Sequence, residues 1–209
     1  MKKIVFAVAI LAMLIGMVGQ ADAVPLPIGG TAFATGVTPS PGIGAALASL
    51  SIPFTGLDAN NNVWFTGVLN QWVRANAAGL MVFEYQVINN PGSVASITLA
   101  DTTDYDSFTT NVDVLGPGVI PFLISRPAPG NAVSFSYLVP PVAPGSTSGL
   151  MWIETNAPTY QLFGTTQLQG TGNTRLDTYA PAVPEPASAM LLGLGLVGFV
   201  GKLRRKFMA

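Results

Sequence analysis

Three aspartates lie close together near the middle of the chain: Asp101, Asp104 and Asp106. Closely spaced carboxylates on a loop supply the hard oxygen ligands that calcium prefers. Counted from Asp101, positions six and twelve are Asp106 and Val112, so the glycine and the glutamate of an EF-hand loop are missing. The alternative is a solvated turn whose aspartates accept backbone hydrogens. We expect no cofactor, with calcium at these three aspartates as the one possibility that the spacing leaves open.

Glu84 and Glu154 are the two glutamates between the terminal segments of the chain. A pair of carboxylates is the catalytic set of most glycosidases. No nucleophile or acid motif surrounds either residue, however, and glutamates on strands usually point to water or pair with arginine. We therefore expect no catalytic residues and a protein that is not an enzyme.

Three tryptophans, Trp64, Trp72 and Trp152, leave two interpretations open. An exposed indole offers a flat apolar face with a polar edge and can stack on a sugar ring. Tryptophans in a small β domain more often belong to the core. Exposed aromatic side chains would favour a carbohydrate-binding or adhesive module, and buried tryptophans would favour a structural role.

Cysteine and histidine are both absent from the 209 residues. Without cysteine there are no disulfides, thiolate nucleophiles or thiolate metal sites. Without histidine there is no Ser-His-Asp triad and no ordinary zinc site. Enzymatic hypotheses are thereby restricted to carboxylate chemistry.

The central part of the chain, residues 24–184, is acidic. It holds eight acidic and three basic residues, all three of them arginines, for a net charge of −5. Nucleic-acid binding requires clustered Lys and Arg to neutralise phosphates. We therefore expect no nucleic-acid partner.

The clearest strand covers residues 80–88, where apolar and mixed side chains alternate with period two. Residues 63–74 alternate in the same way, and residues 76–79 between them predict a hairpin turn. Further strands are expected at 94–99, 108–115, 133–139, 150–155 and 160–168.

Short strands separated by turns predict an all-β fold, an antiparallel β-sandwich over residues 24–170, with Ig-like or jelly-roll connectivity undecided. Residues 24–56 are rich in Gly, Pro, Ala and Thr and predict a long loop with one or two edge strands, of which 31–35 is the better candidate. Residues 171–182 contain Gly172, Asn173 and Pro181 and predict a spacer.

The amino terminus has the organisation of a secretory signal peptide, residues 1–23. Two lysines precede an apolar run, and Ala21 and Ala23 form a small-x-small cleavage site for signal peptidase. The alternative is an uncleaved membrane helix, but 15 apolar residues, Ile4 to Val18, are short for a bilayer core of about 30 Å.

The carboxyl terminus, residues 183–209, has three successive parts. Pro184, Glu185 and Pro186 precede an apolar stretch at 187–201, which is expected to be a transmembrane helix. A basic cluster follows and is expected to stay cytoplasmic under the positive-inside rule; it consists of Lys202, Arg204, Arg205 and Lys206. The alternative is a permanent tail anchor that happens to follow a Pro-Glu-Pro sequence.

The order of tripeptide, apolar span and basic stop resembles the PEP-CTERM sorting signal. The resemblance implies processing by exosortase, a membrane transpeptidase of bacteria that often make exopolysaccharide, with Pro184, Glu185 and Pro186 as the recognised motif. It further implies a precursor held transiently in the inner membrane and a mature form at the cell surface or outside the cell. We expect a non-enzymatic surface or extracellular-matrix protein associated with exopolysaccharide or biofilm. The alternative is a carbohydrate-binding or adhesive module, with or without calcium.

Overall fold

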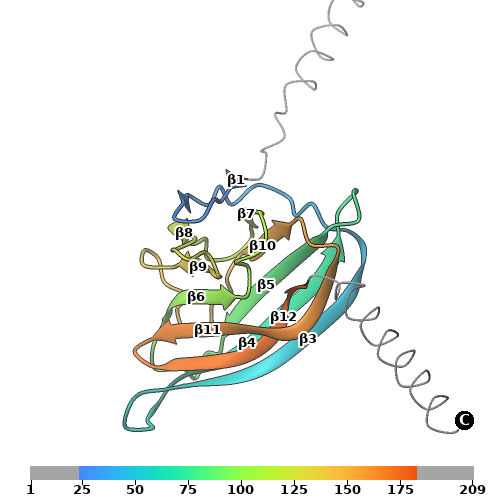
Figure 1. The fold of residues 1–209 in the computed structure, drawn as a ribbon. Helices are drawn as coiled ribbons and strands as arrows, with labels where there is room; N and C mark the ends of the chain where they lie inside the picture. The colour runs from blue at the N-terminus through green and yellow to red at the C-terminus, as the bar shows by residue number, and fades with distance from the viewer. Residues whose placement is uncertain (1–23, 183–209) are drawn as a thin grey trace, which may run out of the picture.

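The computed structural model describes residues 24–182, which form twelve strands and no helix (Figure 1). All strand pairs are antiparallel, which confirms the predicted all-β antiparallel class. The strands are β1 (Val24–Pro25), β2 (Thr31–Ala32), β3 (Ile43–Leu57), β4 (Val63–Ala75), β5 (Met81–Asn89), β6 (Ile97–Thr103), β7 (Thr110–Leu115), β8 (Leu123–Ser125), β9 (Ala132–Ser136), β10 (Leu150–Thr155), β11 (Thr159–Gly170) and β12 (Asn173–Ala182).

The predicted sandwich of two sheets is wrong, because the strands form one sheet in the order β1-β7-β10-β5-β4-β3-β12-β11-β6-β9-β8-β2. The error came from β3 and β12, which lie in segments predicted to be a loop and a spacer. These two strands join the halves of the sheet at the pair Asn173↔Leu57. Without them, the remaining strands divide into two groups of five and would form two sheets.

The predicted spacer at residues 171–182 is corrected in the same way. Residues 173–182 form β12, which pairs with β11 along its whole length as far as Ala182↔Thr159. Its inward side chains, Leu176, Thr178, Ala180 and Ala182, are buried, whereas Arg175 and Asp177 on the other face are exposed. The folded domain therefore continues to Ala182.

The hairpin predicted from the alternating pattern is confirmed: β4 and β5 pair from Gly67↔Asn89 to Ala75↔Met81. Asn76 closes the turn because its Oδ1 accepts the N–H groups of Ala78 and Leu80, both at 2.9 Å. Gly79 follows with φ at 78°, a conformation that costs glycine little.

The core fills the concave side of the curved sheet, where the inward side chains of the long strands are buried. Phe54 of β3 and Phe65 of β4 pack edge to face, with ring centroids 6.0 Å apart. A Cβ at Gly56 would lie 2.2 Å from the Phe65 ring, and one at Gly67 would lie 2.5 Å from the Phe54 ring. The two glycines inside these strands therefore make room for the aromatic pair.

The two ends of the sheet are close together in the chain and in space. β1 and β2, the outermost strands, are separated by residues 26–30 alone. Arg126, directly after β8 at one end, donates to the carbonyl oxygen of Phe108 at 2.8 Å and to Thr110 Oγ1 at 3.2 Å, at the other end. The sheet is thus curled until its two ends meet, and the Arg126 side chain and residues 26–30 link them.

Several predictions concern residues outside 24–182. These are the signal peptide with Ala21 and Ala23, the tripeptide Pro184 to Pro186, the transmembrane helix at 187–201 and the basic cluster at 202–206. Within the described range no helix has the length and apolar character to cross a membrane.

Candidate functional site

The outer face of β4, β5, β10 and β7 carries three carboxylates and two tryptophans: Glu84, Glu154, Asp113, Trp72 and Trp152. Glu84 pairs with Trp72 on one side and with Trp152 on the other. Glu154 lies two residues beyond Trp152 on the same strand, so both glutamates project from the same face as diagonal neighbours. Such neighbours are about 7–8 Å apart in antiparallel sheets.

Both glutamates are engaged by fixed partners. Glu84, 4% exposed, accepts a hydrogen bond of 2.9 Å from Arg74 Nε. The two oxygens of Glu154 accept from the amides of Asn76, at 2.7 Å, and Asn111, at 2.9 Å. The hydrogen bonds of Glu154 connect β10 to the β4–β5 turn and to β7, so this carboxylate has a structural role.

A segment that the sequence predicted as loop covers part of this face. We call residues 34–42 the strap. Asp113 of β7, fully buried, holds it: Asp113 Oδ1 accepts the Thr35 N–H at 2.8 Å, and Oδ2 accepts the hydroxyls of Thr35 at 2.7 Å and Thr38 at 2.6 Å. Trp152 Nε1 donates to the Thr38 carbonyl at 3.2 Å, and Trp152 is completely buried. The strap therefore shields the centre of the face from solvent.

Sequence reasoning missed the role of Asp113, although one clue was available. Asp113 lies between Val112 and Val114, which both point into the core, so its carboxylate must emerge on the opposite face. A carboxylate that is buried there requires donors from another segment. The threonine-rich stretch before β3 provides them.

The three tryptophans do not form an exposed stacking surface. Trp152 is buried, and Trp64 and Trp72 are half-buried. Trp64 Nε1 donates to Asp58 Oδ2 at 2.9 Å, and this bond, with two from Asn62, lowers the pKa of Asp58 well below its usual range. The exposed aromatic pair is instead Phe33 and Phe122, whose rings meet edge to face with centroids 5.8 Å apart.

The aspartates predicted as calcium ligands are held by different partners. Asp101 Oδ1 on β6 accepts the Ser134 hydroxyl at 2.6 Å, and Asp104, with φ at 75°, accepts the Thr103 hydroxyl. Asp104 and Asp106 line one hollow of about 230 Å³. Within residues 24–182 no three side chains of Asp or Glu gather closely enough to hold a metal ion. Calcium binding stays a prediction from the sequence.

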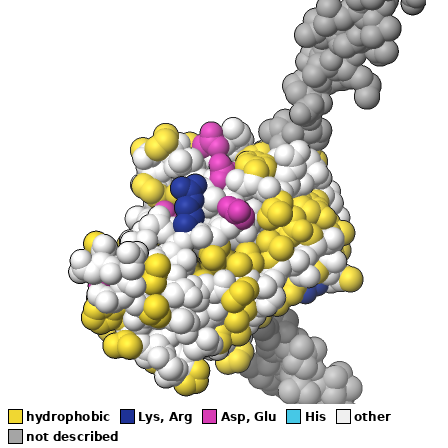
Figure 2. All heavy atoms as spheres, turned by 90° about the horizontal axis from the view of Figure 1, so that it is seen from below, with side chains coloured by type: hydrophobic (Ala, Val, Ile, Leu, Met, Phe, Trp, Pro, Cys, Tyr) yellow, Lys and Arg dark blue, Asp and Glu magenta, His cyan; other side chains and the backbone are white. Residues whose placement is uncertain are grey.

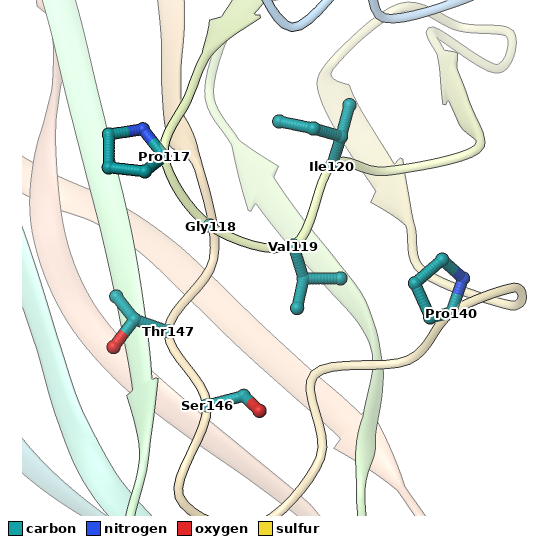
Figure 3. A pocket seen from close by; sticks show the side chains of 7 residues that line it. All are labelled: Pro117, Gly118, Val119, Ile120, Pro140, Ser146 and Thr147. Atoms are coloured by element: carbon teal, nitrogen blue, oxygen red, sulfur yellow. The ribbon is translucent and has the colours of Figure 1, made fainter.

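The domain has two larger hollows as well. One, of about 700 Å³, is lined by two adjacent loops and one proline: Pro117, Gly118, Val119, Ile120, Pro140, Ser146 and Thr147 (Figure 3). The loops are joined by hydrogen bonds from Val119 N–H to the Thr147 carbonyl and from Gly149 N–H to the Val119 carbonyl. This lining offers apolar contacts and two hydroxyls, and no charged group.

The other hollow, of about 480 Å³, lies where the ends of the sheet meet and includes Asp106, Asn111, Arg126 and Asn156. Arg126 is 2% exposed, and its burial lowers the pKa of its guanidinium, an effect that Asp106 opposes. Its five N–H groups are directed at five acceptors, which leaves none for a ligand. The acceptors are the carbonyls of Leu26, Tyr105, Phe108 and Gly130 and the hydroxyl of Thr110. Arg126 therefore stabilises the joined ends of the sheet.

The fold and these contacts define a β domain whose buried polar side chains are used to hold its segments together. The family model for the PEP-CTERM protein-sorting motif matches residues 182–206, beginning at the last residue of β12, and confirms the resemblance seen in the sequence. This motif implies an exported protein whose membrane-anchored precursor is processed by exosortase. Neither the curated proteins nor the solved structures contain a match to this chain.

Proposed function

We propose that the β domain is the non-enzymatic cargo of the sorting signal and acts at the cell surface or in the extracellular matrix, associated with exopolysaccharide. The observation that carries the proposal is the position of the motif. It begins at residue 182, where β12 ends, so sorting delivers the whole folded domain. Processing would leave the domain outside the cell.

A non-enzymatic role is supported by how the carboxylates are used. Glu84 is paired with Arg74, Glu154 with two asparagines, and Asp113 with the strap. A general acid or base needs a proton path to a substrate, and a nucleophile needs a free approach. Each of these groups instead accepts hydrogen bonds from neighbouring protein donors, Glu84 through Oε2 and Glu154 and Asp113 through both oxygens.

The proposal is tested by replacing Pro184, Glu185 and Pro186 with alanine and fractionating the host. The variant is expected to accumulate in the inner membrane as full-length chain, while the wild type reaches the surface. The matched control replaces Pro91 and Pro144, which are exposed in turns of the domain, and should be sorted normally. Normal surface delivery of the motif variant would refute exosortase sorting through this tripeptide.

A carbohydrate-binding or adhesive role is the second candidate, favoured by the exposed pair of Phe33 and Phe122, 67% and 55% exposed. Flat apolar rings on the surface of a β domain are suited to the apolar faces of sugars. Retention on immobilised host polysaccharide that is lost in Phe33→Ala and Phe122→Ala, but not in Val94→Ala, would support this role. Equal retention of all variants would exclude the pair as the contact.

A further inference from the structure

The folded domain ends very close to the apolar part of the sorting signal. β12 is paired with β11 as far as Ala182↔Thr159. The apolar stretch begins at residue 187, so four residues, 183–186, connect the two. An extended chain spans at most about 3.3–3.6 Å per residue, so the five steps from Ala182 to residue 187 reach no further than about 18 Å. When residues 187–201 are in a bilayer, the end of the domain at Ala182 must therefore lie within about 18 Å of the hydrocarbon core.

Apolar side chains surround this end of the domain. We call Leu47, Tyr160, Leu162 and Phe163 the exit collar. Tyr160 pairs with Pro181 across the β11–β12 ladder, and Leu162 pairs with Tyr179. The Tyr160 hydroxyl donates to the Leu47 carbonyl at 3.2 Å, and Phe163 lines the same small hollow as Ala182. These contacts place all four residues near the point where the chain leaves the fold.

The exit collar is exposed in the isolated domain. Leu47 is 53%, Leu162 55% and Phe163 49% exposed, and the Tyr160 ring packs edge to face on Tyr179 with centroids 5.4 Å apart. Figure 2 shows hydrophobic side chains gathered in a band on the face seen from below, with basic and acidic groups beside them. Leucine and aromatic side chains of this kind favour the membrane interface.

We infer that the exit collar docks on the lipid bilayer in the precursor, so that the domain rests on the outer surface of the inner membrane before processing. The inference rests on the proposed function, because it requires residues 187–201 to be in the membrane. The tether makes docking possible with weak contacts, since four residues hold the collar at a high effective concentration next to the bilayer.

The charge of the domain indicates which lipids the exit collar tolerates. Asp104 and Asp106 line the hollow that Phe163 and Ala182 share, and the domain has no lysine. Docking therefore depends on apolar contacts rather than on attraction to anionic headgroups. It is expected to survive high salt and to be weaker on anionic than on neutral bilayers.

The test uses the full chain in lipid nanodiscs, at one chain per disc, with an environment-sensitive fluorophore on a single introduced cysteine. The absence of natural cysteines makes each label unique. Three variants are compared. Leu162→Cys lies in the exit collar, and Leu194→Cys lies within the apolar stretch. Thr55→Cys is at an exposed position of β3, near the end of that strand that is far from Leu47. Quenching is measured with brominated neutral lipid and with iodide in the water.

Docking predicts that the labels at 162 and 194 are quenched by the lipid and protected from iodide, whereas the label at 55 behaves in the opposite way. A label at 162 that iodide reaches as easily as the label at 55, with 194 in lipid, overturns the docking and leaves membrane insertion intact. A label at 194 that stays in water overturns both. Protection at 162 that appears only when several chains share a disc assigns the exit collar to a second copy of the chain and also overturns the inference.

Discussion

Gln71 in β4 forms a pair of hydrogen bonds with the backbone of Tyr179 in β12. Gln71 Nε2 donates to the Tyr179 carbonyl at 2.7 Å, and the Tyr179 N–H donates to Gln71 Oε1 at 2.8 Å. β4 and β12 are not neighbours in the sheet order, because β3 lies between them. The completely buried Gln71 amide therefore takes the place of a strand partner and joins the two halves of the sheet from inside.

Replacing Gln71 with leucine should leave the Tyr179 N–H without a partner and its carbonyl with only the longer hydrogen bond, 3.4 Å, from the Tyr85 hydroxyl. A buried group left unpaired costs about 1–3 kcal/mol, so we expect the free energy of unfolding to fall by about that amount. Urea unfolding followed by circular dichroism measures it. Gln161→Leu, at an exposed position of β11, is the matched control and should change the value by less than about 0.5 kcal/mol.

Gln71→Glu provides a test that depends on pH. An ionised carboxylate would face the Tyr179 carbonyl in a buried site, which raises the pKa of the introduced acid. The protonated acid can donate to that carbonyl and still accept the Tyr179 N–H. The variant should therefore be less stable than the wild type at about pH 8 and recover much of the difference near pH 5. A difference that does not change with pH would contradict the paired geometry.

The strap makes a prediction for tryptophan fluorescence. Asp113→Ala removes the acceptor of Thr35 and Thr38, so the strap should loosen over the buried Trp152. We expect a red shift of the emission, stronger quenching by acrylamide and a loss of about 2–4 kcal/mol in unfolding free energy. Asp177→Ala, which changes an exposed aspartate on β12, should show none of these effects. Unchanged quenching in Asp113→Ala would mean that the strap does not depend on this carboxylate.

Arg126 should not tolerate lysine. The guanidinium directs its N–H groups to acceptors at both ends of the sheet, and an ammonium group cannot reproduce this planar fork. Arg126→Lys is expected to lower the unfolding free energy by about 2–4 kcal/mol, because several acceptors lose their donors. Arg175→Lys, at an exposed site, tests the same chemical change without burial and should be nearly neutral.

Acid should weaken the turn between β3 and β4. Hydrogen bonds from Trp64 and Asn62 lower the pKa of Asp58 below that of an unfolded aspartate, near 3.9. The stabilisation is therefore present above about pH 4 and lost as the pH falls further towards the lower folded-state pKa. Below about pH 4 the wild type should lose stability more steeply than Asp58→Asn, which does not titrate. If the unfolding free energies of the two proteins fell in parallel with decreasing pH, the ionised Asp58 carboxylate would contribute no stability.

The sequence predicted the hairpin well because its two strands have one buried and one mixed face. Residues 63–74 and 80–88 became β4 and β5 with small shifts, and residues 150–155 became β10 without any. In these strands apolar and polar residues alternate, and this pattern is visible in a short window of sequence.

The strands that were missed have weaker local patterns. β3 runs through small residues, from Gly44 and Ala45 to Ser49 and Ser51, and its outward positions are exposed. β12 contains Pro181 and exposes Arg175 and Asp177. Each strand pairs with its neighbour in sequence, β4 for β3 and β11 for β12, but its other partner is distant in sequence, because β3 and β12 pair with each other. The stabilisation from that distant partner is absent from any short window of sequence.

The candidate site could be predicted only in part. Glu84 and Glu154 were recognised as the carboxylates to consider, but their common face depends on the register of β5 and β10. The partners of Asp113 lie more than 70 residues away, in Thr35 and Thr38. The sorting motif could be identified from the sequence alone, because its tripeptide, apolar stretch and basic cluster are adjacent in the chain.

The most direct test of the account is the carboxyl-terminal peptide of the mature protein. Surface material from the host is digested, and the last peptide is identified by mass spectrometry. The account predicts a chain that keeps β12 to Ala182, ends at or near Pro184 to Pro186, and lacks residues 187–209. A surface form whose last peptide extends to Ala209 would contradict it.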